Sequence, residues 1–227
     1  MIRVYNAVKE KKAIRTVAGV FFMIILPVLF VTGCWSDLDE ISDMLDNKAY
    51  NLRDRGPAGG WIFLIVKNGD GTTTYYEAAP VEQEESNIAW GPSGTNENGV
   101  DLSSPPELTG IGDGKTNSQY IYETYAGSLS SFPAFQACYN YTGGGYTDWF
   151  LPSKDELYMM CWNLHGKNLS NPDVPSGGVG GFADESYWSS SEHDDGMAWR
   201  QSFAIDYQGT SSKSSDLRVR AVRAFTY

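Results

Sequence analysis

One segment, GGGYTDWFLPSKDEL at residues 143–157, constrains the local fold of this chain more than any other. Within it, Ser153 and Glu156 have the S-x-x-E spacing of a capping box, in which the serine hydroxyl and the glutamate carboxylate each accept a backbone N–H at a helix start. The apolar residues that follow have the spacing of one buried helix face: Leu157, Met160, Cys161 and Leu164. We therefore predict a short amphipathic helix with Ser153 and Glu156 as its structural cap, in preference to a catalytic carboxylate pair.

The amino terminus has the layout of an export signal. Basic residues dominate residues 1–15, and an uncharged apolar run extends from there to Cys34, as in the n-region and h-region of a signal peptide. The run ends in Val-Thr-Gly-Cys, which resembles the lipobox of bacterial lipoproteins. We predict that residues 1–33 are removed and that Cys34 carries a lipid. An uncleaved membrane anchor and an ordinary secretory signal are the alternatives.

A lipid on Cys34 would attach the exported chain to a membrane of the bacterial envelope. Trp35 and Ser36 follow Cys34, so the Asp that retains some lipoproteins in the inner membrane is absent from the next position. We therefore expect the outer membrane or the cell surface rather than the inner membrane. Residues 34–55 are rich in acidic side chains and are predicted to form a tether.

The predicted mature chain is strongly acidic. Five of the 17 basic residues but one of the 28 acidic residues lie in residues 1–33, which leaves 12 basic and 27 acidic residues and a net charge near −15. Such a surface repels nucleic acid and anionic lipid. We therefore predict no nucleic-acid partner, and a membrane contact only through the lipid on Cys34.

Residues 56–227 are predicted to form one α+β domain, because no later linker interrupts them. The runs WIFLIVK (61–67) and TTTYYEAA (72–79) flank the sequence NGDG, a strong hairpin signal. The pattern also predicts helices at 117–129 and 133–141, strands at 187–191, 197–206 and 217–225, and long loops at 80–115 and 166–186.

Cys138 and Cys161 are the two cysteines beyond the predicted lipidation site. Export to an oxidising compartment would allow one disulfide between them. Both lie in apolar contexts that favour helix, where a free cysteine packs as a small hydrophobic side chain. The sequence leaves both outcomes open and favours two free thiols.

Six motifs follow one another along residues 56–227. They are GPAGGWIF (56–63), EAAP (77–80), IGDGKTN (111–117), ACYNYTGGGYTDWFLPSKDEL (137–157), YWSSSE (187–192) and VRAVRAF (219–225). Their order resembles that of the Lcl C-terminal domain family of bacterial surface modules. The resemblance implies a C-type lectin-like fold, with two main helices packed on small antiparallel sheets and long loops that present a ligand. It also implies binding rather than catalysis, with sulfated glycosaminoglycans as ligands of the founding adhesin.

This sequence departs from that adhesin in its charge. A polysulfated chain needs a concentrated basic patch, and the one cluster of basic residues is Arg218, Arg220 and Arg223. Strand alternation predicts that Arg218 and Arg220 share a solvent-exposed face, with Arg223 on the other face unless a bulge intervenes. We therefore expect a neutral glycan or a protein as the ligand.

The candidate ligand contacts are Trp90 and three acidic residues, Glu192, Asp194 and Asp195. Trp90 precedes the loop GPSGTNENG and is expected to be partly exposed. The oxygen-rich sequence EHDDG could hold Ca²⁺, but a solvated hairpin turn is favoured, because adjacent strand residues point in opposite directions. The Glu-Pro-Asn and Gln-Pro-Asp triplets of calcium-dependent lectins are absent from the sequence. No cofactor is expected, with Ca²⁺ as the minor alternative.

The sequence contains no complete match to the catalytic motifs considered below. GIGDGKT (110–116) resembles a phosphate-binding loop, but Thr109 occupies the position of an essential glycine. His165 and His193 are the only histidines, and neither belongs to a zinc or nucleophile motif. We therefore predict a non-catalytic, lipid-anchored recognition or adhesion module that binds a carbohydrate or a protein. A structural envelope lipoprotein is the alternative, and an enzyme like the formylglycine-generating enzymes ranks third.

Overall fold

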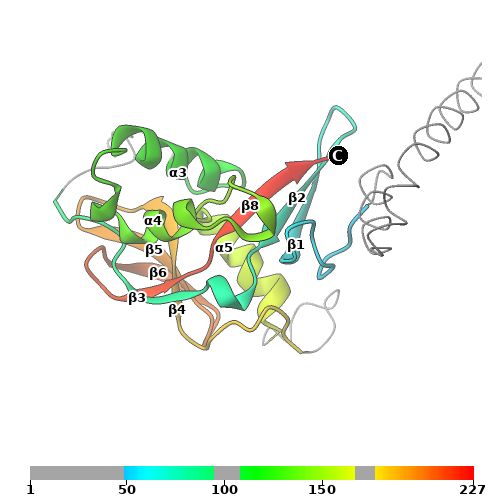
Figure 1. Cartoon of the computed structure of the whole chain (residues 1–227). Helices are drawn as coiled ribbons and strands as arrows, with labels where there is room; N and C mark the ends of the chain where they lie inside the picture. The colour runs from blue at the N-terminus through cyan, green and yellow to red at the C-terminus, as the bar shows by residue number, and fades with distance from the viewer. Residues whose placement is uncertain (1–48, 95–107, 167–176) are drawn as a thin grey trace, which may run out of the picture. The chain divides into compact units, whose positions relative to one another are not determined.

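The computed structural model describes residues 49–94, 108–166 and 177–227 (Figure 1). The predicted signal peptide, the predicted lipidation site Cys34 and most of the predicted tether lie outside these residues. Tyr50–Tyr227 form one compact unit. None of the described helices is long and apolar enough to cross a lipid bilayer.

The folded domain begins earlier than the sequence predicted. Arg53 donates its backbone N–H to the carbonyl of Ile62 at 2.8 Å, and Ile62 donates to the carbonyl of Asp54 at 2.9 Å. The side chain of Tyr50 is buried against the sheet that contains Ile62. Residues 50–55, which we assigned to the tether, are therefore part of the domain.

An antiparallel three-stranded sheet contains the first two strands and the last strand of the described domain. Its strands, in spatial order, are β1 (Trp61–Lys67), β2 (Thr73–Ala78) and β8 (Val222–Thr226). The predicted hairpin is confirmed, since Asn68 donates to the carbonyl of Thr72 at 2.9 Å across the turn. Gly71 has a φ of 90° there, which a residue with a Cβ rarely adopts.

Aromatic side chains cover the face of this sheet that does not contact the main helices. Tyr75 on β2 and Phe225 on β8 stand opposite each other, with ring centroids 5.6 Å apart. The ring of Tyr50 meets both rings edge-on, at 5.3 Å and 5.7 Å. Tyr227 extends the cluster to the surface and is 44% exposed. Tyr50 therefore holds the first described residues against the end of the chain.

A second sheet has five strands, and its β4–β7 pair is parallel while its other pairs are antiparallel. Its strands, in spatial order, are β3 (Glu85–Ile88), β7 (Leu217–Val219), β4 (Ser186–Glu192), β5 (Met197–Ser202) and β6 (Tyr207–Ser212). Two of these strands were not predicted. β6 was missed, and β3 lies in the segment that we expected to be a long loop.

The predicted single strand at 217–225 is wrong. The chain leaves β7 after Val219 and enters β8 at Val222, so one continuous segment contributes to two different sheets. The break is held from both sides, because Ala221 donates its N–H to the side chain of Gln83 at 2.8 Å and Val222 pairs with Phe150. The alternation of inward and outward side chains consequently does not continue through the segment.

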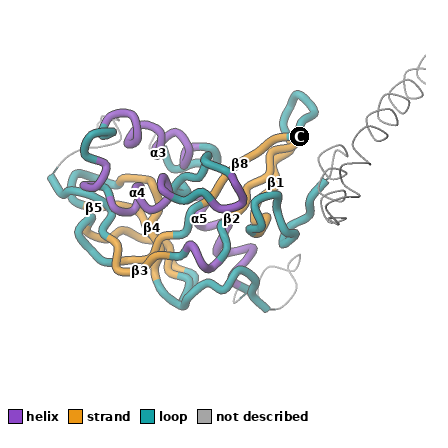
Figure 2. Tube along the Cα trace, in the orientation of Figure 1, coloured by secondary structure: helices purple, strands orange, loops and turns teal. Residues whose placement is uncertain are grey.

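Three α-helices occur among the described residues, and α3 and α4 lie together at one end of the domain while β1, β2 and β8 lie at the other (Figure 2). They are α3 (Asp113–Thr124), α4 (Pro133–Asn140) and α5 (Lys154–Met160). The capping box is confirmed at the start of α5. A further helical turn, Cys161–His165, extends α5 until Gly166 ends it with a φ of 74°.

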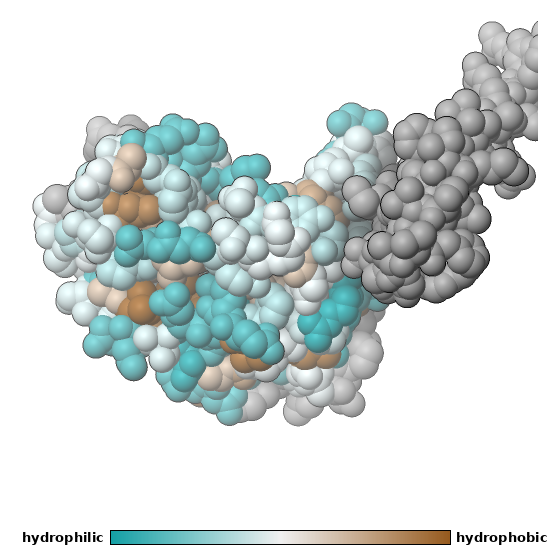
Figure 3. Space-filling view, in the orientation of Figure 1, coloured by the Kyte–Doolittle hydropathy of each residue, from teal (hydrophilic) through white to brown (hydrophobic). Residues whose placement is uncertain are grey.

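Two larger clusters of buried residues form most of the core. One cluster packs α3 and α4 against the five-stranded sheet and includes Trp90, Phe135 and Trp188. The other packs α5 against the three-stranded sheet and against β4 and β5 of the second sheet, and it includes the predicted apolar face of that helix. On the face shown in Figure 3, hydrophobic residues form small separate patches on a largely hydrophilic surface.

The α+β class is confirmed by this arrangement of three described helices and eight described strands. The expectation of two main helices is too low, because α3, α4 and α5 all pack on sheets. The C-type lectin-like fold implied by the resemblance stays a prediction.

Candidate functional site

Trp90 is not a surface residue. Its side chain is fully buried, its ring meets Phe135 edge-on at 5.0 Å, and its Nε1 donates to the carbonyl of Ser189 at 2.8 Å. Its backbone N–H also bonds to the carbonyl of Lys213 at 2.9 Å, which draws the chain inward after β3. The expectation that Trp90 is exposed to a ligand is therefore wrong.

Glu192 is also buried, contrary to the prediction of a solvated turn. β4 extends through Glu192, and its carboxylate forms an ion pair with Lys213 in which both side chains are completely buried. The ammonium group of Lys213 also lies 5.0 Å from the centroid of the Trp90 ring. Two of the four predicted ligand contacts thus belong to one buried cluster that Lys213 connects.

Asp194 and Asp195 lie at the tip of the β4–β5 hairpin, as predicted for a turn. Asp194 accepts the backbone N–H of Gly196 at 2.8 Å and contacts the ring of His193 at 2.9 Å. Asp195 is exposed, and its carbonyl accepts the N–H of Gly94 at 2.7 Å. The hairpin tip is therefore fixed beside the loop that follows Trp90, and a ligand contact by these two residues stays a prediction.

The three acidic residues proposed for calcium do not converge on one point. Glu192 is turned inward to Lys213 while Asp194 closes the surface turn. Across the described part of the chain, no group of three or more His, Cys, Asp or Glu side chains has a geometry that could hold a metal ion. Nothing in the described hairpin therefore supports calcium coordination by Glu192, Asp194 and Asp195 together.

Cys138 and Cys161 are free and buried. Cys138 lies in the cluster beneath α3 and α4, whereas Cys161 lies in the cluster beneath α5. Burial raises the pKa of both thiols, to about 12 for Cys161. The disulfide left open by the sequence does not form in this structure, and both cysteines pack as small hydrophobic side chains.

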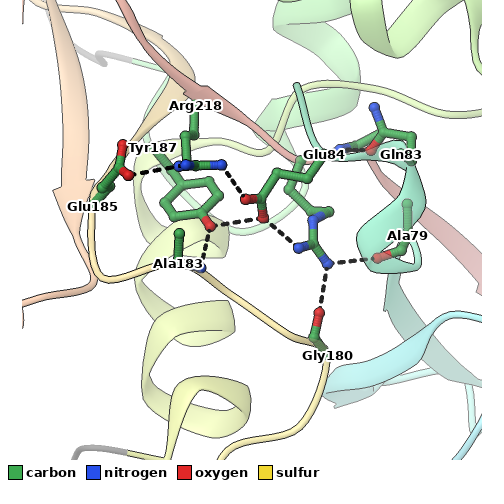
Figure 4. Close-up of polar contacts among 10 residues, drawn as sticks. Ala79, Gln83, Glu84, Gly180, Ala183, Glu185, Tyr187 and Arg218 are labelled. Atoms are coloured by element: carbon green, nitrogen blue, oxygen red, sulfur yellow. Dashed lines mark hydrogen bonds and ion pairs between the residues drawn. The ribbon is translucent and has the colours of Figure 1, made fainter. Parts of the chain in front are cut away.

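A buried polar network is centred on Glu84 (Figure 4). One carboxylate oxygen accepts Nη1 of Arg218 at 2.7 Å, and the other accepts the hydroxyl of Tyr187 at 2.7 Å. The second oxygen also pairs with Nη2 of Arg220. Burial, followed by the nearby Glu84, raises the pKa of Tyr187, so its hydroxyl stays protonated and donates.

Arg220 connects this network to two backbone segments. Its Nη1 donates to the carbonyl of Ala79 at 3.0 Å and to the carbonyl of Gly180 at 2.9 Å. Its guanidinium also lies 4.2 Å from the centroid of the Phe182 ring. The network therefore holds the segment before β4 against the connections that follow β2 and β7.

Arg223 forms a second network on the outer face of the three-stranded sheet. Its guanidinium is bonded to the carboxylate of Asp148 at 2.9 Å and 3.0 Å, pairs with Glu77 at 3.4 Å, and lies 3.7 Å from the centroid of the Tyr146 ring. Burial by itself would lower the pKa of Arg223. The hydrogen bonds and charge of Asp148 and the charge of Glu77 act in the opposite direction, and the pKa of Arg223 is raised overall.

The predicted placement of the three arginines is therefore wrong. Arg220 and Arg223 are buried, and Arg218 is mostly buried, whereas alternation placed Arg218 and Arg220 on a wet face. The reason is the break between β7 and β8, together with carboxylates from distant segments that neutralise each guanidinium. These residues do not form a basic surface patch.

Glu156 accepts hydrogen bonds from two helix starts. Its Oε2 accepts the N–H of Ser153 at 2.8 Å, which completes the predicted capping box, and its Oε1 accepts the N–H of Gly112 at the start of α3 at 2.8 Å. A Cβ on Gly114 would lie 2.2 Å from Oε2. The segment that resembled a phosphate loop thus holds the carboxylate of Glu156 where a phosphate loop would hold an anion.

Arg200 differs from these arginines, because it is half-buried on β5 and no carboxylate among the described residues lies within ion-pairing distance. Its Nε donates to the hydroxyl of Ser211 at 2.8 Å and its Nη1 to the hydroxyl of Ser186 at 3.0 Å. Its guanidinium lies 5.8 Å from the ring centroid of Tyr207, which is 54% exposed. We call these four residues the Arg200 site.

The sequence did not single out the Arg200 site. Arg200 lay in a predicted strand, but β6, which supplies Ser211 and Tyr207, was not predicted. The available signal was the alternation of Tyr207, Gly209 and Ser211, which places their side chains on one face of a strand.

Trp199 is the aromatic residue of β5; it is half-buried and lies beside Lys154 of α5. The ammonium group of Lys154 lies 4.4 Å from its ring centroid, and the ring of His193 meets it at 5.4 Å. Trp199 thus has neighbours within the domain, and Tyr207, which is 54% exposed, is the more accessible ring on this sheet.

The model of the Lcl C-terminal domain family matches residues 80–223, more than half of the sequence. The chain belongs to the Lcl C-terminal domain family. This confirms the resemblance and identifies the chain as a surface or adhesion-type bacterial module. The matched residues of the Lcl domain include Arg200, Tyr207 and the Glu84 network, whereas β1 and β2 precede them.

Among solved structures, the Lcl domain is similar to a fimbrial protein from Bacteroides ovatus ATCC 8483, with a TM-score of 0.40 and 15% sequence identity. The similarity covers 67% of this chain and 35% of the fimbrial protein, so the chain spans about a third of that protein's length. A likeness at this level establishes neither a common fold nor a common function. No curated protein matches the chain.

Proposed function

We propose that this protein is a lipid-anchored recognition module of the bacterial envelope, non-catalytic, that binds a carbohydrate or protein ligand through the surface of its Lcl domain. The observation that carries the proposal is membership of the Lcl C-terminal domain family. The anchor is Cys34, placed at the end of the apolar amino-terminal run. Its expected location is the outer membrane or the cell surface.

The distribution of charged side chains supports binding over catalysis. Glu77, Glu84, Glu156 and Glu192 are all engaged by arginine, lysine or backbone N–H groups inside the domain. These four carboxylates are also buried, so they stabilise the scaffold and do not face a substrate at the surface. The same rigid scaffold holds the segments on either side of the Glu84 network, as a module that presents surface loops requires.

We also propose that the arrangement is a variant of the C-type lectin-like fold. Two small sheets, with helices packed against each and long connections between them, support this assignment. The fold itself does not specify the ligand. The proposed activity requires no bound cofactor.

A structural envelope lipoprotein is the second candidate. The aromatic row of Tyr50, Tyr75, Phe225 and Tyr227 favours it, because a partly exposed aromatic edge at the end of a sheet suits packing against another protein. In that case the domain has a permanent protein partner and no soluble ligand.

A glycan array probed with the fragment from residue 49 to 227 tests the leading proposal, with cross-linking on intact cells as its second arm. Residues 50–55 must be included, because they pack on the sheet. Saturable binding to a glycan, or reversible capture of a surface protein, supports a recognition module. Failure to bind any glycan, with a stoichiometric envelope protein recovered by cross-linking, would establish the structural alternative instead.

A further inference from the structure

We propose that the Arg200 site binds the carboxylate of an acidic sugar, such as a uronate or a sialate, while the sugar ring lies on Tyr207. The proposal rests on the recognition function proposed above and names the ligand class and the binding residues of that module. It replaces the neutral glycan that the net charge of the sequence suggested.

The first support is the uncompensated charge of Arg200. Arg218, Arg220 and Arg223 each pair with at least one carboxylate. Arg200 is half-buried, yet its polar partners among the described residues are hydroxyl groups alone. Because a partly desolvated guanidinium favours an anionic partner, this position attracts a carboxylate from outside the domain.

The second support is the fixed orientation of the guanidinium. Ser211 accepts from Nε and Ser186 accepts one N–H of Nη1, which leaves the other N–H of Nη1 and both of Nη2. Nη2 bonds to no described residue, and it is not completely buried, so a ligand can reach it. The planar fork formed by Nη1 and Nη2 matches the two oxygens of a carboxylate.

The third support is the position of Tyr207. Its ring lies against the backbone of β6, since a Cβ added to Gly209 would be 2.7 Å from Cε1 of Tyr207. Gly209 therefore allows the ring to lie along the strand while 54% of the residue stays exposed. Such a ring presents an apolar face beside a polar group, the combination that accommodates the C–H face of a sugar.

The net charge of the domain does not exclude this ligand. At physiological ionic strength, exposed charges more than about 8 Å apart are largely screened from each other. The charged groups close to the Arg200 site therefore determine whether an anionic ligand binds there. A single guanidinium suits one carboxylate. A polysulfated chain would instead require several cations, and Arg218, Arg220 and Arg223 are already paired.

The test is binding of sialyllactose and of oligogalacturonate to the full-length protein in detergent micelles, measured by calorimetry. The methyl esters of the two sugars are the matched ligands without a free carboxylate. We expect at least one acidic sugar to bind, with its affinity falling roughly tenfold or more on esterification or on Arg200→Gln. Tyr207→Ala should weaken binding to a similar extent, whereas Tyr207→Phe should retain it.

Arg55→Gln is the control variant, because Arg55 is an exposed arginine that donates to the carbonyl of Gly59 and forms no ion pair with a carboxylate of the described residues. It should bind as the wild type does. Because Tyr207 is mostly exposed, Tyr207→Ala keeps the test valid even if Arg200→Gln unfolds.

Three results would overturn the Arg200 assignment. They are equal affinity for the ester and the acid, unchanged binding by Tyr207→Ala and Arg200→Gln, and preferential binding of dextran sulfate or poly-glutamate. If the protein instead binds a neutral glycan, the recognition function stands and the Arg200 assignment fails. If it binds no glycan and no protein, both proposals fail.

Discussion

The carboxylate of Glu156 accepts the backbone N–H of Gly112 at 2.8 Å, although the two residues stand at the starts of different helices. The same carboxylate accepts the N–H of Ser153 at 2.8 Å. One side chain therefore satisfies donors of α3 and α5, which otherwise would remain without partners at a buried helix junction. Glu156 therefore joins the start of α3 to the start of α5.

The stability of the domain should depend on pH through Glu156. Burial raises the pKa of Glu156 to about 7, against the opposing effect of its N–H donors. Between the unfolded pKa of about 4.3 and that value, the folded state holds a proton that the unfolded state has lost. The contribution of Glu156 to stability is therefore complete below the unfolded pKa and is lost as the pH rises through the folded pKa.

Urea unfolding of the wild type and Glu156→Gln across this range measures the effect. The difference in free energy of unfolding between the two proteins should fall by up to about 3 kcal/mol from about pH 4.5 to about pH 8. Asp113 and Tyr76 face Glu156 and remain in both proteins. A difference that stays constant with pH would show that Glu156 keeps an ordinary pKa.

Gly114→Ala should destabilise the domain by about 1–3 kcal/mol or more. The new Cβ would lie 2.2 Å from Oε2 of Glu156 and 2.6 Å from the backbone nitrogen of Ser153, so the junction would have to open. Gly127→Ala is the matched control, because nothing lies within 4 Å of its Cβ position. Equal melting temperatures for the two variants would contradict this packing.

Glu84→Ala should cost roughly 3–5 kcal/mol, the range for removing one partner of a buried ion pair. The side chain of Arg220 is fully buried and would lose its carboxylate partner. Glu82→Ala is the control, since Glu82 is exposed on the adjacent turn of η1 (Val81–Gln83). Chemical denaturation of both variants measures the difference, and an equal cost would mean that the Glu84 network contributes little to stability.

Tyr50→Ala should destabilise the domain by about 3 kcal/mol, as for other large aromatic residues that are truncated in a core. Tyr50 is buried among Tyr75, Phe225 and Tyr227. Tyr120→Ala, at an exposed position on α3, should cost far less. A fragment that begins at residue 56 should have a lower melting temperature than one that begins at residue 49. Identical melting curves would show that residues 50–55 do not stabilise the domain and belong to the tether.

Both thiols of the fragment from residue 49 should be unreactive until it unfolds. Burial raises the pKa of Cys138 and Cys161, and the thiolate is the reactive form. We expect iodoacetamide to label neither cysteine in the native fragment and to label both in urea without reductant. Labelling in urea that requires prior reduction would reveal a disulfide.

The sequence determined the parts of this protein that depend on neighbouring residues. Ser153 and Glu156 are separated by one helical turn, so their capping box could be recognised directly. The turn between β1 and β2 follows in the same way from the NGDG sequence. The family resemblance was also readable, because it rests on the order of short motifs.

Tertiary structure decided the environment of the charged and aromatic side chains. Glu84 meets Arg218 and Arg220 across more than a hundred residues of chain, so no local pattern could show that these arginines are buried. Trp90 was expected at the surface and Arg200 was not singled out, because burial depends on which distant strands arrive beside a residue. The strand predicted at 217–225 is interrupted between β7 and β8, so Arg220 does not follow the alternation that the sequence suggested. The Arg200 site likewise forms only where β4, β5 and β6 meet.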